Sequence, residues 1–159
     1  MDRARCAGST ALIVVVVVAL FGAWGGRTVL AGSVGWPPST LVVSEVQTGG
    51  ASASDEFVEI ANQGAAQVDL AGLEVVYATS SGSTVTRKAA WATLTVIDPG
   101  RRLLIANAAG VVAGRADLTY AGGFAATGGA VALRVVGGSV VDAIGWGDAT
   151  NGFVEGSAA

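Results

Sequence analysis

The sequence predicts an all-β domain of the sandwich or barrel type, and three observations agree on this. Hydrophobic residues make up 52% of the 159-residue chain and charged residues only 13%, while glycine occurs 24 times. Short runs rich in β-branched residues alternate with turn signals from residue 41 to residue 146. No segment after residue 31 shows a sustained helical period, so a helical or mixed fold is not expected.

We expect eight main strands, because each apolar run is bounded by glycine, proline or small polar residues. They cover residues 41–47, 56–62, 73–79, 84–88, 92–97, 101–107, 130–136 and 139–146. The glycine-rich segment 108–129 is predicted to be an irregular excursion that holds one short strand around residues 118–120. Eight short strands at this spacing are typical of a sandwich or barrel.

The pair Gly137-Gly138 predicts a two-residue hairpin turn between the last two strands. This turn would place Val135 opposite Val140 and Leu133 opposite Asp142. Asp142 would then share a face with apolar side chains, where an unpaired carboxylate is costly. We therefore expect Asp142 to lie near the sheet edge or to accept hydrogen bonds.

The first 31 residues have the composition of a secretory signal. Arg3 and Arg5 form a positive end, residues 11–23 are apolar, and Val29-Leu30-Ala31 suits a signal peptidase. Two interpretations stay open for residues 1–31, a cleaved signal peptide or an uncleaved membrane anchor. Either one predicts a secreted or cell-surface protein that contacts a membrane only through this segment, if it is uncleaved.

Residues 32–40 are predicted to be an exposed linker, because Pro37 and Pro38 cannot join a strand ladder. Cys6 is the only cysteine, and it precedes the apolar run. A chain cleaved after Ala31 would therefore have neither a disulfide nor a thiolate metal site. The stability of the exported domain would have to come from its core.

The charge balance argues against a nucleic-acid partner. The chain has 12 acidic and 9 basic residues, and residues 32–159 hold 11 of the acidic residues but only 6 of the basic ones. An acidic surface without a basic stripe repels phosphate backbones. There is also no histidine, which removes the commonest general base and metal ligand.

Five segments in order carry a resemblance to a known family. They are SEVQ (44–47), DEFVEIANQG (55–64), VDLAGLEV (68–75), DPGRRLLIAN (98–107) and VVDAIGWGD (140–148). Together they resemble the lamin tail domain in its bacterial secreted form, over residues 41–150. The resemblance implies an immunoglobulin-like β-sandwich and brings no catalytic residues. Because the chain has no heptad rod, a filament role does not transfer.

The resemblance implies a non-catalytic extracellular or cell-surface module whose partner is a protein or a cell-surface polymer. Two alternatives stay open, a secreted carbohydrate- or cell-wall-binding domain and an accessory domain of a larger exported hydrolase. Bacterial relatives commonly continue into a linker and a further segment after the equivalent of residues 151–159. These residues are therefore either a truncated tail or the end of a domain that closes without that segment.

Three carboxylates, Asp55, Glu56 and Glu59, form the most conspicuous acidic cluster. Alternate side chains of a strand share a face, so Glu56 and Glu59 would point in opposite directions and could not hold one ion. With Phe57 facing inward, Glu59 would also face inward and accept hydrogen bonds from backbone amides or from an Arg or Thr. Asp55 and Glu56 would be solvated at the strand entry, and no catalytic or metal site is predicted here.

Other candidate residues also favour a structural role. Asp148 and Asn151 could join Asp142 in an oxygen-ligand loop, but their spacing does not match the EF-hand pattern. The tryptophans at positions 36, 91 and 146 could stack on sugar rings, although packing in the core or at its ends is commoner. Nucleophile motifs are absent, and Lys88 is the only lysine. No cofactor is expected, and the sequence assigns no ligand-binding residues.

Overall fold

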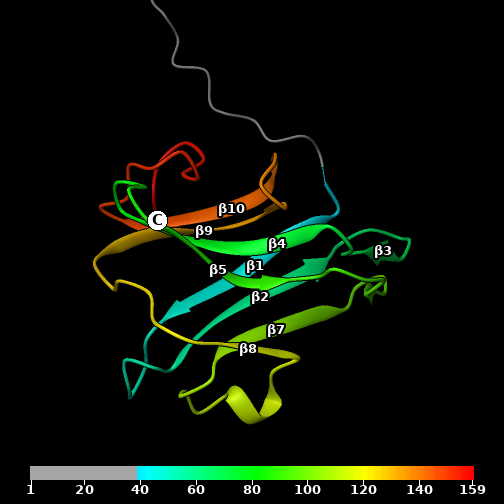
Figure 1. Ribbon diagram of the computed structural model, residues 1–159, viewed down its shortest axis with the longest axis horizontal. Coiled ribbons are helices and arrows are strands. Elements are labelled where there is room, and N and C mark those ends of the chain that lie inside the picture. Colours follow the sequence, from blue (N-terminus) through cyan, green and yellow to red (C-terminus); the bar gives the residue numbers. More distant parts are fainter. Residues whose placement is uncertain (1–38) are drawn as a thin grey trace, which may run out of the picture. The chain divides into compact units, whose positions relative to one another are not determined.

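The computed structural model describes residues 39–159, which form a sandwich of two four-stranded sheets (Figure 1). The first sheet has the order β1-β2-β7-β8, and the second has the order β10-β9-β4-β5. The first comprises β1 (Leu41–Thr48), β2 (Glu56–Asn62), β7 (Arg102–Asn107) and β8 (Leu118–Tyr120). The second comprises β10 (Val140–Gly147), β9 (Gly128–Val135), β4 (Leu73–Thr79) and β5 (Val85–Ala90).

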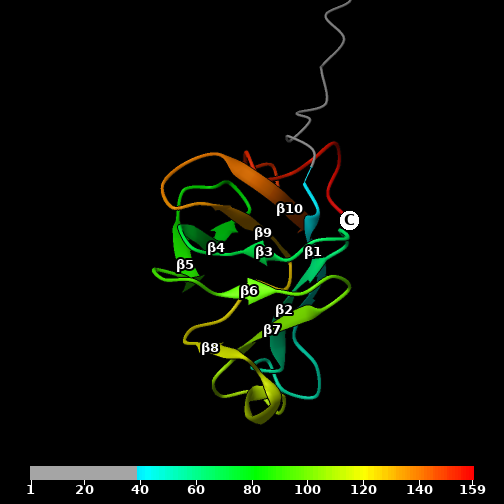
Figure 2. The ribbon, with the colours of Figure 1, turned by 90° about the vertical axis from the view of Figure 1, so that its right-hand side faces the viewer.

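A small pair of strands, β3 (Val68–Asp69) and β6 (Val96–Ile97), lies beside the two sheets (Figure 2). All strand pairs are antiparallel except β7 and β8, which run parallel. The connection between these two strands carries a 3-10 turn, η1 (Ala113–Arg115), the only helical element in residues 39–159. The predicted all-β sandwich is therefore confirmed.

The core lies between the two sheets and follows the alternation of their strands. Val58 and Ile60 of β2 and Ile105 of β7 are fully buried from one side. Val131 and Leu133 of β9 are fully buried from the other. Every second residue of a strand faces the partner sheet, so these apolar positions form one continuous hydrophobic core.

The strand predictions hold for most elements and fail at the small pair. Residues 92–97 were expected to be a full strand, yet only Val96–Ile97 pairs, and it pairs with β3, which the sequence did not predict. Asp69 explains part of this local structure, because its carboxylate accepts hydrogen bonds from the amides of Ala71 and Thr95. Such side-chain bonds give the backbone an alternative to a ladder.

The last hairpin departs from the predicted register at its turn. Asp142 pairs with Leu133 as expected, but Val140 pairs with Arg134 rather than with Val135. The register shifts between Val140 and Asp142, which marks an irregularity of the bulge type. The turn itself uses Gly137 with a φ of +65°, a conformation that favours glycine.

The segment after β10 folds back along that strand. The amide of Ala159 donates to the Gly145 carbonyl, and the amide of Gly147 donates to the Ala159 carbonyl, both at 3.0 Å. Val154 covers Gly145, where a Cβ would lie 2.7 Å from its Cγ2 atom. The free edge of β10 is thereby partly covered by residues 154–159.

The predicted signal or anchor segment 1–31 and most of the linker 32–40 lie outside the described residues. Within residues 39–159, no helix is long and apolar enough to cross a membrane.

Candidate functional site

The structure reverses the predicted orientation of β2. Glu56 faces the core, whereas Phe57 and Glu59, which were expected to face inward, lie on the opposite face. Asp55 and Glu56 are only 3% and 1% exposed, while Phe57 and Glu59 are half-buried. The expectation that Asp55 and Glu56 are solvated is therefore wrong. Val58 and Ile60 determine which face is inward, and they carry Glu56 inward with them.

Glu56 is held inside the sandwich by two hydrogen bonds. Its Oε2 accepts from the Asn107 side-chain amide at 3.0 Å, and its Oε1 accepts from the backbone amide of Phe124 at 2.7 Å. Gly123 lets the chain approach closely, since a Cβ at this position would lie 3.1 Å from Glu56 Oε1. Glu56 thus ties β2 to the end of β7 and to the segment that leads into β9.

Asp55 joins two loops at the same end of the domain. Its carboxylate accepts from the amides of Ser52 at 2.8 Å and Val111 at 3.0 Å. The bond from Val111 and then the bond from Ser52 lower the pKa of Asp55 below its usual range. These bonds favour the ionised form, so Asp55 acts as an anchor for the segment 107–111 rather than as an acid or base.

Glu59 behaves as expected in one respect, because it accepts hydrogen bonds within the fold. Its Oε1 contacts Arg102 of β7 at 2.5 Å and the Ser44 hydroxyl of β1 at 2.7 Å. The prediction of an Arg partner on an adjacent strand is confirmed. The face is nevertheless the outer one, and the Arg102 side chain is 62% exposed.

Glu74 of β4 is a buried carboxylate that the sequence analysis missed. It is 1% exposed and contacts Arg87 at 2.5 Å, Arg134 at 2.8 Å and the Gly137 amide at 3.1 Å. Burial raises the pKa of Glu74, but the bonds from Gly137 and the two arginines outweigh it, so the pKa lies below its usual value. The sequence pattern that could have revealed this site is a single glutamate within an otherwise apolar strand.

Lys88 of β5 was also missed, and it extends into an aromatic enclosure. Its Nζ lies over the rings of Tyr77, Tyr120 and Phe124, with centroid distances of 5.6, 4.7 and 5.2 Å. The same Nζ lies 3.3–3.4 Å from the carbonyls of residues 121–123. Burial lowers the pKa of Lys88, while the charge of Glu56 acts in the opposite direction.

The three residues considered for an oxygen-ligand loop are not brought together around one point. Asp142 Oδ2 accepts from the Val43 amide at 2.6 Å, whereas Asp148 accepts from the Ser80 hydroxyl at 2.7 Å. Asn151 instead donates from Nδ2 to the Thr79 carbonyl at 3.0 Å. Across residues 39–159 no cluster of three or more acidic, histidine or cysteine side chains could hold a metal ion.

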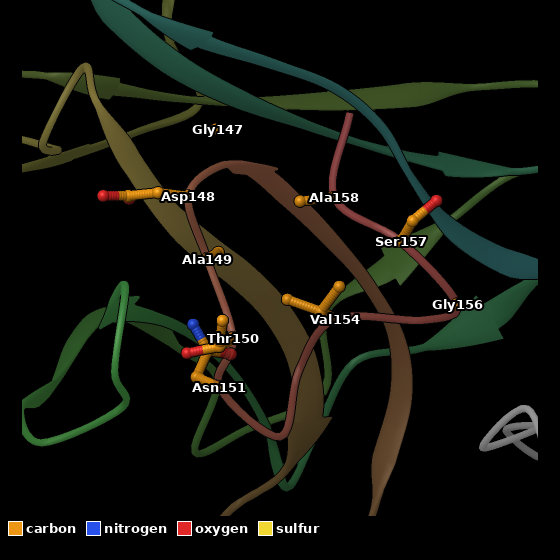
Figure 3. A pocket seen from close by; sticks show the side chains of 9 residues that line it. All are labelled: Gly147, Asp148, Ala149, Thr150, Asn151, Val154, Gly156, Ser157 and Ala158. Atoms are coloured by element: carbon orange, nitrogen blue, oxygen red, sulfur yellow. The ribbon is translucent and has the colours of Figure 1, made fainter. Parts of the chain in front are cut away.

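A pocket of about 490 Å³ lies beyond the end of β10 (Figure 3). It is lined by residues 147–151, Val154 and residues 156–158, most of which have small side chains. Asp148, Thr150 and Ser157 supply polar side chains at its rim, and Asp148 and Thr150 are exposed. The pocket is open and lined by small and polar residues, so it offers hydrogen-bonding groups rather than an enclosed apolar cavity.

The two tryptophans in the described part of the chain do not form an exposed platform. Trp91 is 5% exposed and belongs to the core. Trp146 is half-buried, stacks on Tyr77 at 6.0 Å and donates from Nε1 to the Ala125 carbonyl at 2.9 Å. Packing therefore explains both residues, and Trp36 lies outside the described residues.

The comparisons with known proteins give one result that bears on identity. The family model described as Lamin Tail Domain matches residues 37–148. The chain belongs to the lamin tail domain family. The two-sheet architecture agrees with the immunoglobulin-like sandwich expected for a lamin tail domain. No curated protein matches the chain. Family membership supports a non-catalytic module of immunoglobulin type.

Proposed function

We propose that this lamin tail domain is a non-catalytic extracellular or cell-surface module that binds a protein or a cell-surface polymer. The observation that best supports the non-catalytic part is that the buried carboxylates bind groups of the fold itself. Glu56 and Glu74 are each satisfied by groups of the fold itself. An acid or base that served a substrate would need an open path to it. The extracellular location rests on the signal-like composition of residues 1–31.

The pocket beyond β10 is the surface that best suits such binding. Its rim joins the loop after β4 to residues 147–158, because Ser80 bonds both the Gly128 carbonyl and Asp148. Loops at one end of a sandwich can present contacts while the sheets stay rigid. Exposed backbone and hydroxyl groups would recognise the amides of a peptide or the hydroxyls of a polysaccharide.

Location is tested by expressing the full chain in a bacterial host and fractionating the cells. The protein is expected in the medium or on the surface, where protease added to intact cells digests it. Retention in the cytoplasm, protected from the protease, would contradict the extracellular part of the proposal.

Binding is tested by sedimentation of the purified protein with isolated cell envelopes. Thr150 is an exposed pocket residue, and Leu94 is a 75% exposed residue outside the pocket. Thr150→Arg is expected to reduce sedimentation, while the matched charge change Leu94→Arg leaves it unchanged. Equal binding by both variants would rule out the pocket, and no sedimentation of the wild type would rule out an envelope partner.

A further inference from the structure

A buried amine, a buried amide and a buried carboxylate lie together at the end of the sandwich where β5 approaches β8. Lys88 is 8% exposed, Asn107 is 6% exposed and Glu56 is 1% exposed. Lys88 belongs to one sheet, and Glu56 and Asn107 belong to the other. We propose that Lys88 and Asn107 form an intramolecular isopeptide bond, with Glu56 as the group that transfers the proton.

The amine and the amide are close neighbours. Lys88 Nζ and Asn107 Nδ2 each lie 3.4 Å from the same Gly122 carbonyl oxygen, so they are no more than twice that distance apart. Rotation about the terminal bonds of the flexible lysine side chain can bring Nζ towards Cγ of Asn107. Once Nζ reaches Cγ, the fold holds both groups in place, and the otherwise slow amine–amide exchange becomes effectively unimolecular.

The surroundings of Lys88 favour the reactive form of the amine. Lys88 is buried, yet it forms no ion pair: within residues 39–159, no carboxylate oxygen lies within 4.0 Å of its Nζ. The three carbonyl contacts of 3.3–3.4 Å are long for bonds from an ammonium group, which are usually near 2.8 Å. Burying an ammonium is costly even beside the aromatic rings, and burial lowers the pKa of Lys88, so the neutral amine, which is the nucleophilic form, is easier to reach than in water.

The Asn107 amide is held in an orientation that suits attack. Its Oδ1 accepts from the Ala109 backbone amide at 3.1 Å, which would stabilise negative charge developing on that oxygen. Its Nδ2, the leaving nitrogen, donates to Glu56 Oε2 at 3.0 Å. The Glu56 carboxyl is thus in contact with the atom that must receive a proton.

The reaction balances without a co-reactant. The lone pair of Lys88 Nζ forms a bond to Cγ of Asn107, and the bond from Cγ to Nδ2 breaks. One proton passes from Nζ through Glu56 to Nδ2, and ammonia leaves. The product is a neutral secondary amide whose remaining N–H can donate to Glu56 as Nδ2 did.

The consequence is a covalent tie between the two sheets of a domain that has no disulfide. Residues 32–159 contain no cysteine, so disulfide stabilisation is not open to this part of the chain. The bond would join β5, an edge strand of one sheet, to the end of β7 in the other. The reaction would occur once in each molecule and would need no external substrate.

The test is the intact mass of the full chain after purification and identification of its N-terminal residue. The wild type is expected to be lighter by one ammonia than the sequence that begins at that residue. Digestion with trypsin is expected to give one branched peptide that joins residues 88–101 to residues 103–115, since cleavage after a bonded Lys88 is blocked. An unmodified mass would overturn the proposal, and loss of water instead of ammonia would overturn Asn107 as the partner.

Two variants separate the isopeptide bond from other losses of ammonia. Lys88→Arg keeps a cation but removes the amine, and it is expected to show the unmodified mass. If that variant still loses ammonia, the loss comes from cyclisation at an asparagine, and the proposal fails. Glu56→Gln keeps an acceptor for the Phe124 amide and is expected to remain largely unbonded; full bonding would overturn the role of Glu56.

Discussion

Asp142 and Val43 join the two sheets through a hydrogen bond of 2.6 Å from the Val43 backbone amide to Asp142 Oδ2. Val43 lies at the point in β1 where the register with β2 shifts, so its amide is free to point towards β10. The bond therefore closes the side of the sandwich where β1 and β10, an edge strand of each sheet, lie close together.

Asp142→Ala is expected to destabilise the domain by roughly 1–3 kcal/mol, because the Val43 amide would lose its partner. Asp142→Asn should cost less, since an amide oxygen can still accept. Burial raises the pKa of Asp142, so the charged carboxylate has a desolvation cost here that asparagine does not have. Urea unfolding of the two variants and the wild type measures the difference. Equal losses for both variants would show that the acceptor oxygen is not what matters.

Glu74→Gln is expected to lower the free energy of unfolding at neutral pH by roughly 1.5–3 kcal/mol, because Arg134 and the Gly137 amide lose a charged acceptor. The folded-state pKa of Glu74 lies below the unfolded value of about 4.5. Its contribution is therefore fully present above pH 4.5 and is lost as the pH falls through the folded-state pKa. Urea unfolding at several pH values should show the gap to the wild type shrinking in acid.

Glu155→Gln is the matched control for this pH series, because Glu155 is exposed in the segment after β10. It is expected to stay within about 0.5 kcal/mol of the wild type at every pH. If the gap between Glu74→Gln and the wild type grew in acid, the ionised form of Glu74 would not be the stabilising one.

Gly110→Ala is expected to destabilise the domain by roughly 1–3 kcal/mol. A Cβ at Gly110 would lie 2.2 Å from the Ser54 carbonyl oxygen, and this backbone contact can be relieved only by moving a loop. Gly114→Ala, a few residues along the same connection, meets nothing within 4 Å and should stay within about 0.5 kcal/mol. Thermal unfolding of both variants compares them directly, and similar melting temperatures would contradict the close packing of Gly110.

Sequence patterns predicted the strands well wherever apolar runs were long. The runs 41–47, 56–62 and 73–79 correspond to β1, β2 and β4, because alternating or continuous apolar residues have few other ways to be buried. The two-residue strands β3 and β6 were not predictable in this way. Strands that short depend on local contacts such as those of Asp69 rather than on periodicity.

The acidic residues show where periodicity alone was insufficient. In β2 it correctly placed Glu56 and Glu59 on opposite faces, but Phe57 was taken as the inward residue. The structure buries Val58 and Ile60 instead, and one inverted choice reverses every side chain of a strand. The partners of Glu56 also come from distant segments, Asn107 and Phe124, which no local pattern reveals.

The most direct test of the claim that the buried carboxylates are structural ties compares Glu56→Ala with Glu59→Ala by urea unfolding, both in the Lys88→Arg background, where no bond to Asn107 can form. Glu56→Ala should cost roughly 1.5–3 kcal/mol, because it removes a charged acceptor from the Asn107 side chain and the Phe124 amide inside the core. Glu59→Ala should cost about 0–1 kcal/mol, because its Arg102 partner is 62% exposed. A larger loss for Glu59→Ala, or equally small losses for both variants, would contradict this account.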